Sequence, residues 1–308
     1  MTGAHISVLQ HQTIEQLLAG RTHGCFVDAT FGRGGHCRAL LARLDADSRV
    51  YAFDKDPEAQ QVGQALMQED PRLVMIHASY ARLQPELAAQ RVTAVDGIMA
   101  DLGVSSPQLD QAGRGFSFLQ DGPLDMRMDN SRGATAAELL MQWGETELAD
   151  VLYQYGEERY SRRIARAIKQ HLATHGPITR TVALAELIKT AHPRWEKHKH
   201  PATRSFQAIR IAVNAELADL DLFLQQTIPL LSPGGRLAVI SFHSLEDRRV
   251  KQFIQQHSQD QSDGWPVAGA LRPPLRKGPR IAADEAEVTA NPRARSAWLR
   301  VAERVEEP

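Results

Sequence analysis

Short apolar runs alternate with helix-like patterns through the first hundred residues. The runs are predicted as strands at 26–28, 49–54, 72–78 and 94–101, and a lead helix is predicted at 5–20. Between the runs, apolar residues recur at helical spacing. Strands that alternate with helices indicate a parallel sheet with right-handed crossovers. The class expected for this part of the chain is therefore α/β.

The pattern changes after residue 101. Residues 102–129 are irregular and rich in Gly, Pro, Ser and Asp, although their Phe and Met content indicates an ordered segment. Helices are then predicted at 135–142, 145–155, 158–174, 181–191 and 203–224. This is too much helix for one crossover, so we expect an inserted helical domain. The expected boundaries are 1–108 and 205–308 for the sheet domain and 109–204 for the insertion.

The end of the chain returns to strand patterns. A buried strand is predicted at 233–242, and the following helix is expected to start with Ser244 as its N-cap. The segment 263–295 is rich in proline and basic residues, which predicts a loop. Residues 296–304 alternate and predict a closing antiparallel strand at the edge of the sheet.

Composition narrows the class of protein. The chain has 308 residues, 43% of them hydrophobic, and only 2 cysteines, which argues against a disulfide scaffold and a cysteine zinc site. No signal peptide or membrane-spanning apolar run is visible, so a cytoplasmic location and no membrane partner are expected. The histidines of 192–200 lack metal-ligand spacing, and no metal is predicted.

The net charge of −1 hides a local excess of positive charge. Residues 159–210 hold 12 Lys and Arg against 2 acidic residues. Positive charge of this density favours binding to a phosphate backbone. A basic surface without a partner remains the alternative.

Candidate chemistry gathers around the first strand. Asp28 ends this strand, a glycine turn follows with Gly32, Gly34 and Gly35, and Asp54 ends the second strand. A carboxylate at the second position can accept hydrogen bonds from both ribose hydroxyls. The third glycine of the dinucleotide fingerprint is missing, so S-adenosylmethionine fits better than NAD. The glycine turn alone is a weak signal.

Longer motifs are more specific. They are DATFGRGGH at 28–36, DLGVSSPQLD at 101–110, RGFSF at 114–118, DGPLDMRMD at 121–129, YGEER at 155–159, FQAIRI at 206–211, SFHSLEDR at 241–248 and NPRARSA at 291–297. Together they resemble the ribosomal RNA small subunit methyltransferase H family, over nearly the whole chain and in the same order. The resemblance implies a class I (Rossmann-like) S-adenosylmethionine-dependent methyltransferase fold with an inserted all-helical domain. It also implies methylation of the exocyclic N4 amine of a cytidine in 16S rRNA, near the ribosomal decoding site.

The resemblance also carries site residues onto this chain. The implied cofactor-binding residues are Gly34, Gly35, His36, Asp54, Tyr80, Asp101 and Gln108. Phe is the more frequent residue of the family at the position of Tyr80. Segment 255–290 is shorter than the family's pattern and diverges from it more than the rest of the chain does.

The chemistry suggests further residues near the target base. A cytosine amine is a poor nucleophile, and a hydrogen-bond acceptor beside it would orient it and take its proton. Asp101 and Ser106 are the catalytic candidates, and Ser105, Phe116 and His243 are the substrate-binding candidates. The alternatives are turn capping for the serines, packing of the insertion for Phe116, and a structural role for His243.

The expected partner is 16S rRNA within the small ribosomal subunit, and a homodimer is left open. Three other functions are alternatives. An NAD-dependent oxidoreductase is disfavoured by the missing glycine and the basic insertion. A non-catalytic RNA-binding ribosome-assembly factor would keep the fold without methyl transfer, and a DNA methyltransferase would change only the acceptor.

Overall fold

The computed structural model describes residues 7–194, 200–259 and 273–305. The chain divides into two compact units, one formed by Met1–Gly103 with Leu217–Pro308 and the other by Val104–Glu216. We call them the sheet unit and the helical unit. The sequence placed these boundaries at 108/109 and 204/205, so the helical unit takes several more residues at both ends. Within the described residues, no helix is both long and apolar enough to cross a membrane.

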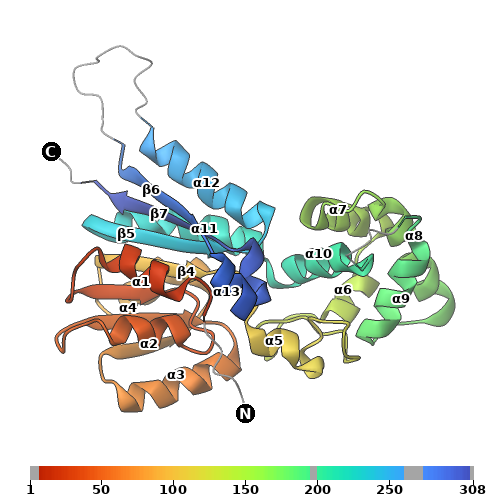
Figure 1. The fold of residues 1–308 in the computed structure, drawn as a ribbon. Coiled ribbons are helices and arrows are strands. Elements are labelled where there is room, and N and C mark those ends of the chain that lie inside the picture. The colour runs from red at the N-terminus through yellow and green to blue at the C-terminus, as the bar shows by residue number, and fades with distance from the viewer. Residues whose placement is uncertain (1–6, 195–199, 260–272, 306–308) are drawn as a thin grey trace. The chain divides into compact units, whose positions relative to one another are not determined.

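The sheet unit contains seven strands within its described residues, in the order β3-β2-β1-β4-β5-β7-β6 (Figure 1). The strands are β1 Cys25–Asp28, β2 Arg49–Asp54, β3 Leu73–His77, β4 Val95–Asp101, β5 Leu231–Ser241, β6 Leu275–Ala282 and β7 Trp298–Arg304. Strands β1 to β5 pair in parallel, whereas β7 is antiparallel to both of its neighbours. The predicted α/β class is confirmed.

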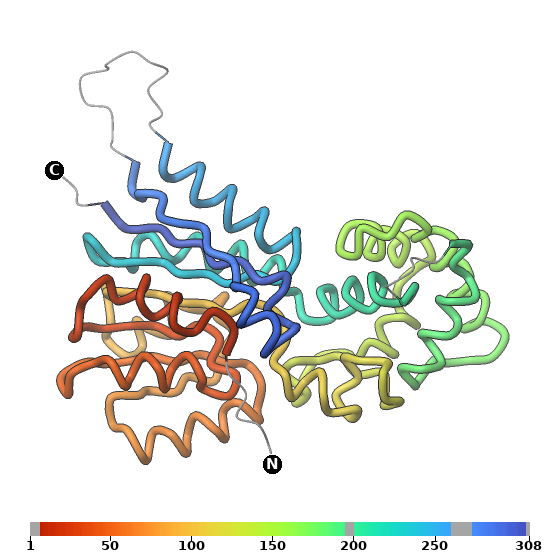
Figure 2. Tube along the Cα trace, in the orientation of Figure 1, coloured from red at the N-terminus to blue at the C-terminus, as the bar shows by residue number. Residues whose placement is uncertain are grey.

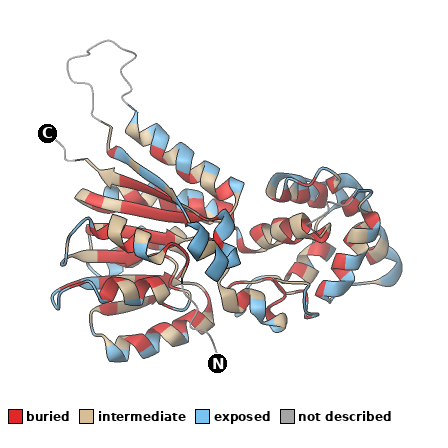
Figure 3. Cartoon of the chain, in the orientation of Figure 1, coloured by how far each residue is buried: buried red, intermediate tan, exposed pale blue. Residues whose placement is uncertain are grey.

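Helices cover both faces of this sheet. One core contains residues of α1 Gln10–Leu18, α2 Gly35–Leu41 and α3 Pro57–Glu69, and the other contains residues of α4 Leu83–Ala89, α11 Glu216–Leu230 and α12 Ser244–Ser258. Successive residues of β5 alternate between the cores, since Leu237 and Val239 face the second and Ala238 and Ile240 the first. This burial on both faces explains the continuous apolar runs of the central strands (Figure 3).

Two predictions about the C-terminal part of the chain are wrong. The predicted loop 263–295 contains strand β6 and helix α13 Glu285–Ala290, while its residues 263–272 lie outside the described residues. The predicted edge strand, β7, is an inner strand because β6 pairs with its free side. The pairing of β6 shifts register between Lys277 and Arg280, which accommodates Gly278 and Pro279.

The helical unit packs around a separate core. Its helices are α5 Ser106–Asp110, α6 Ala136–Gln142, α7 Glu145–Gly156, α8 Ser161–His175, α9 Thr181–Ala191 and α10 Ala202–Asn214, and Figure 2 follows their connections. The irregular segment before α6 is anchored by Phe116, Leu124, Met126 and Met128, all buried in this core. The ordered state that its composition predicts is therefore confirmed.

The predicted helix 203–224 is two helices. Helix α10 ends at Asn214, Ala215 adopts a left-handed conformation with φ of 51°, and α11 starts at Glu216. The Asn214 side chain accepts a hydrogen bond from Met128 N (2.7 Å) and donates one to the carbonyl of Met126 (2.7 Å). These contacts with a segment distant in the sequence stabilise the break between the two helices. The helix propensities of the local residues do not indicate such a break.

Candidate active site

Three aspartates lie at the carboxyl ends of adjacent parallel strands. Asp28 ends β1, Asp54 ends β2 and Asp101 ends β4. Thr30 links two of them, because its backbone N–H donates to Asp28 Oδ1 (3.1 Å) and its hydroxyl accepts from Asp101 N (2.6 Å). In an open α/β sheet, this edge is where ligands bind.

The glycine turn is held against the same edge. Gly32 and Gly34 have φ of 56° and 76°, which L-residues with a side chain rarely adopt. The N–H of Gly32 donates to Asp54 Oδ2 (2.8 Å), and Asp56 N donates to Asp54 Oδ1 (2.9 Å). A Cβ added at Gly32 would meet no atom within 4 Å, so the turn is open there. Each oxygen of Asp54 retains a lone pair for a further donor.

Gly34 and Gly35 have a different reason to be glycine. A Cβ at Gly34 would lie 2.7 Å from the Phe31 ring, and one at Gly35 would lie 2.0 Å from Ser7 Oγ. Close packing within the protein therefore accounts for both residues. Gly32 is the glycine of this turn at which a ligand has room to approach.

Asp28 and Asp101 carry unpaired oxygens. Among the described residues, neither Asp28 Oδ2 nor Asp101 Oδ1 has a hydrogen-bond partner, although both atoms are buried. Burial, with a smaller contribution from the charge of Asp54, raises the pKa of Asp28 to about 7. Burial and the charges of Asp28 and Glu246 raise the pKa of Asp101 well above its ordinary value. Such orphaned carboxylate oxygens fit a cationic or hydrogen-donating ligand.

His36 lies beside Asp101 and stays neutral. Its Nε2 lies 3.1 Å from the carbonyl oxygen of Val8, so this nitrogen carries the proton and donates. Its Nδ1 lies 3.8 Å from Asp101 Oδ2. Burial lowers the pKa of His36 to about 4. At neutral pH, His36 therefore offers an uncharged ring with an acceptor lone pair on Nδ1, and it carries no positive charge.

His243 and Glu246 follow the carboxyl end of β5. Glu246 Oε2 accepts from the backbone N–H of Phe242 (2.9 Å) and of His243 (3.3 Å), and Oε1 lies 3.0 Å from His243 Nε2. The N-cap of α12 is therefore His243, which corrects the prediction of Ser244. Glu246 is 2% exposed, and sequence reasoning did not select it.

A second polar cluster beside this edge was also missed. Asp219 of α11 accepts a hydrogen bond from Ser79 Oγ (2.8 Å), and Lys55 Nζ lies 3.4 Å from the same carboxylate oxygen. Next to Ser79, the Tyr80 ring packs edge-on against Phe223, with the ring centroids 5.2 Å apart. As a whole residue, Tyr80 is half-buried.

Four candidates belong to the helical unit. Ser105 is the N-cap of α5, its N–H donates to Gln108 Oε1 (3.0 Å), and Ser106 is the first residue of that helix. Phe116 is 6% exposed within the core of the unit, and the guanidinium of Arg114 lies 5.9 Å from its ring centroid. Helix capping explains the hydrogen bond of the Ser105 backbone N–H, and packing in the core explains the burial of Phe116. A stacking role for Phe116 does not fit this burial.

The basic segment of the helical unit separates into two kinds of residues. On α8, the side chains of Arg162, Arg163 and Arg166 are exposed, whereas Ile164 and Ile168 are buried. Other cations of the segment are structural. Lys169, for example, donates hydrogen bonds to three carbonyls at the end of α6, those of Leu140 (3.1 Å), Met141 (3.3 Å) and Trp143 (2.7 Å). Of the histidine run, residues 195–199 lie outside the described residues.

Comparison with known proteins gives a consistent result. Residues 2–305 match the model of the MraW methylase family. A relative from Acinetobacter baumannii, named Ribosomal RNA small subunit methyltransferase H, is 63% identical over 307 residues, which cover 99% of each chain. Relatives of the same name from Acinetobacter baylyi and a Psychrobacter species are 62% and 52% identical. They cover 98% and 99% of this chain, and 99% and 92% of their own lengths.

Proposed function

We propose that this chain, which belongs to the MraW methylase family, methylates the exocyclic N4 amine of a cytidine in 16S rRNA near the decoding site. The chain is an S-adenosylmethionine-dependent methyltransferase. Its relatives at 52–63% identity carry a name that specifies small-subunit ribosomal RNA. This name supports the RNA substrate, and the sequence resemblance supports the cytidine amine.

The residues present at the strand ends fit the methyl donor. Asp54 retains acceptor capacity on both carboxylate oxygens, which suits the two ribose hydroxyls. The unpaired oxygens of Asp28 and Asp101 suit the amino groups of the ligand. These orphaned oxygens, close to an open turn at Gly32, are the observation that carries the proposal. The proposed binding residues in the sheet unit also include Gly34, Gly35, His36 and Tyr80, and Gln108 is the proposed one in the helical unit.

The protein's main contributions are to position the methyl donor and the target amine and to provide a proton acceptor. When bound, S-adenosylmethionine supplies a methyl group activated by the adjacent sulfonium. Nitrogen attack then requires that the target amine lose a proton. Burial raises the pKa of Asp101, so its carboxylate, once ionised, is a stronger base than an ordinary aspartate and is suited to accept this proton. Ser106 stays a proposed catalytic residue, and Ser105 and His243 stay proposed contacts of the base.

The exposed arginines of α8 are the proposed RNA-binding surface. Reversing the charge of Arg162, Arg163 and Arg166 should weaken RNA binding and reduce its salt dependence, since each lost phosphate contact lowers the slope by about 0.7–0.9. The slope is measured by titration at several salt concentrations. An unchanged slope would remove α8 from the RNA surface. The assembled subunit as acceptor, a cytoplasmic location and a homodimer remain predictions from the sequence.

The decisive experiment uses labelled S-adenosylmethionine with three acceptors: naked 16S rRNA, small ribosomal subunits and DNA. Products are digested to nucleosides. Label on N4 of cytidine from rRNA or subunits is expected, and the two RNA samples separate free from assembled substrate. Label on DNA alone would show that the acceptor is DNA rather than RNA. The Asp101→Asn variant serves as the control for background transfer.

A further inference from the structure

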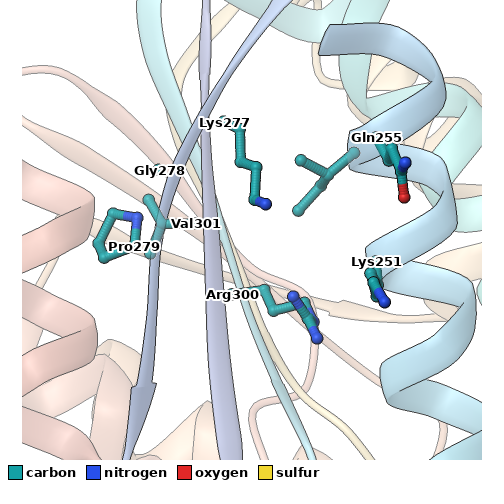
Figure 4. A pocket seen from close by; sticks show the side chains of 8 residues that line it. Lys251, Gln255, Lys277, Gly278, Pro279, Arg300 and Val301 are labelled. Atoms are coloured by element: carbon teal, nitrogen blue, oxygen red, sulfur yellow. The ribbon is translucent and has the colours of Figure 1, made fainter. Parts of the chain in front are cut away.

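The sheet unit has a basic hollow on the face covered by α12. Its lining includes Lys251 and Gln255 of α12, Lys277 and Gly278 of β6, and Arg300 of β7. In Figure 4, the side chains of Lys251, Lys277 and Arg300 extend into the same space from these three elements. Nothing in the proposed transfer chemistry uses this hollow.

Strand register explains why these cations share a face. In the antiparallel pair of β6 and β7, Lys277 lies opposite Ala302, and Arg280 lies opposite Arg300. Ala302 belongs to the core that includes Val250 and Ile254 of α12. Residues directly opposite each other on antiparallel strands point to the same face. Lys277 and Arg300 therefore both point to the α12 side of the sheet.

Positive charge in this region exceeds the available negative charge. Elements α12, β6 and β7 carry eight Lys and Arg against three acidic residues, which are Glu246, Asp247 and Glu303. Asp247 binds the Arg300 guanidinium at 2.7 and 3.0 Å and lies 3.9 Å from Arg280. Glu303 pairs with Arg236 and Arg276, and Glu246 lies against His243. The three carboxylates are thus already engaged.

Arg249 of α12 pairs in addition with Asp221 of α11, and the two lysines of the group differ from it. Lys251 and Lys277 are exposed, and within the described residues neither forms a salt bridge. In Figure 4 they lie on opposite sides of the hollow, Lys251 on α12 and Lys277 on β6. An anion between the two lysines would be attracted by both ammonium groups. The hollow is also lined by the apolar residues Ile254, Pro279 and Val301, so its lysine ammoniums supply the charge that suits a phosphate group.

We propose that this hollow binds a phosphate of the RNA backbone, as a contact separate from the arginines of α8. The inference rests on the proposed function, since it takes RNA as the substrate. Lys251 and Lys277 provide the positive charge. The guanidinium of Arg300, which is hydrogen-bonded to Asp247, lines one side of the hollow. The contact positions the RNA and reads no sequence.

The test compares three versions of the full chain by their RNA affinity at several salt concentrations. The Lys251→Ala/Lys277→Ala variant should bind 16S rRNA roughly tenfold more weakly, with a salt slope smaller by about 1.4 for two lost single-strand contacts. The Lys251→Arg/Lys277→Arg variant should restore both values. The control Arg38→Gln/Arg43→Gln removes the same charge from exposed positions of the α2 region, on the other face of the sheet, and should leave the slope unchanged.

Each other outcome overturns the proposal in a distinguishable way. If the alanine variant keeps the wild-type slope, the hollow does not contact RNA. If inorganic phosphate binds the wild type but not the alanine variant by calorimetry, while the RNA slope is unchanged, the hollow is a small-anion site instead. If the control weakens binding as much as the alanine variant, only net charge matters. Absence of RNA affinity in the wild type would defeat the proposed function itself.

Discussion

Replacing Asp28 by asparagine tests the cost of an ionisable group buried at the candidate active site. Asp28 is 2% exposed, and its pKa rises from an ordinary 3.8 to about 7. A shift of this size corresponds to about 4 kcal/mol at most, at 1.36 kcal/mol per pH unit. The folded state holds this proton more tightly than the unfolded state. Stability from this group is therefore full at acid pH and falls as the pH rises from about 4 to 7.

The asparagine variant should lack that pH dependence. Its Oδ1 can keep the hydrogen bond from Thr30 N, and its amide stays neutral at every pH. The amide nitrogen replaces the unpaired Oδ2 at a cost that is independent of pH. Relative to wild type, the variant should therefore gain up to about 4 kcal/mol between pH 4 and pH 8.

Urea unfolding at half-unit steps from pH 4 to pH 8 measures this difference. The exposed Asp47, changed to asparagine, is the matched control and should show no such trend. A stability difference between Asp28→Asn and wild type that stays constant across the range would refute the reasoning. So would a difference that runs in the opposite direction.

Two other predictions concern Asp54 and Lys169. The Asp54→Ala variant should bind S-adenosylmethionine about 10- to 100-fold more weakly by calorimetry, because two acceptors for the ribose are lost; an unchanged Kd would contradict the assignment. The Lys169→Met variant should lose about 1–3 kcal/mol of unfolding free energy in urea, since the carbonyls of Leu140, Met141 and Trp143 lose their donor. Wild-type stability would show that water replaces the ammonium without cost.

The sequence predicted the sheet well where local pattern and burial agree. Strand β2 was predicted at 49–54 and is found there, since a parallel strand buried on both faces leaves a continuous apolar run. The glycine turn and the strand-end aspartates followed from the same pattern. Their contacts could be expected because the carboxyl ends of adjacent parallel strands meet at one edge.

Features that depend on distant partners were not predicted. Asp219 joins Lys55 and Ser79 across more than a hundred residues of chain, so no local pattern marks it. The break at Ala215 depends on Asn214 reaching the backbone of Met126, although alanine itself favours a helix. Strand β6 was hidden because Gly278 and Pro279 resemble loop residues.

Strand β6 also restricts how this protein can associate with itself. As an outer strand of the described sheet, it presents backbone groups that another strand could pair with. Pro279 has no N–H to offer, and the register shift beside it distorts the ladder. Two copies laid edge to edge would bring Arg276, Lys277 and Arg280 against the same residues of the second copy. Any dimer of this chain is therefore expected to form without extending the sheet through β6, and the edge guards against aggregation into continuous sheets.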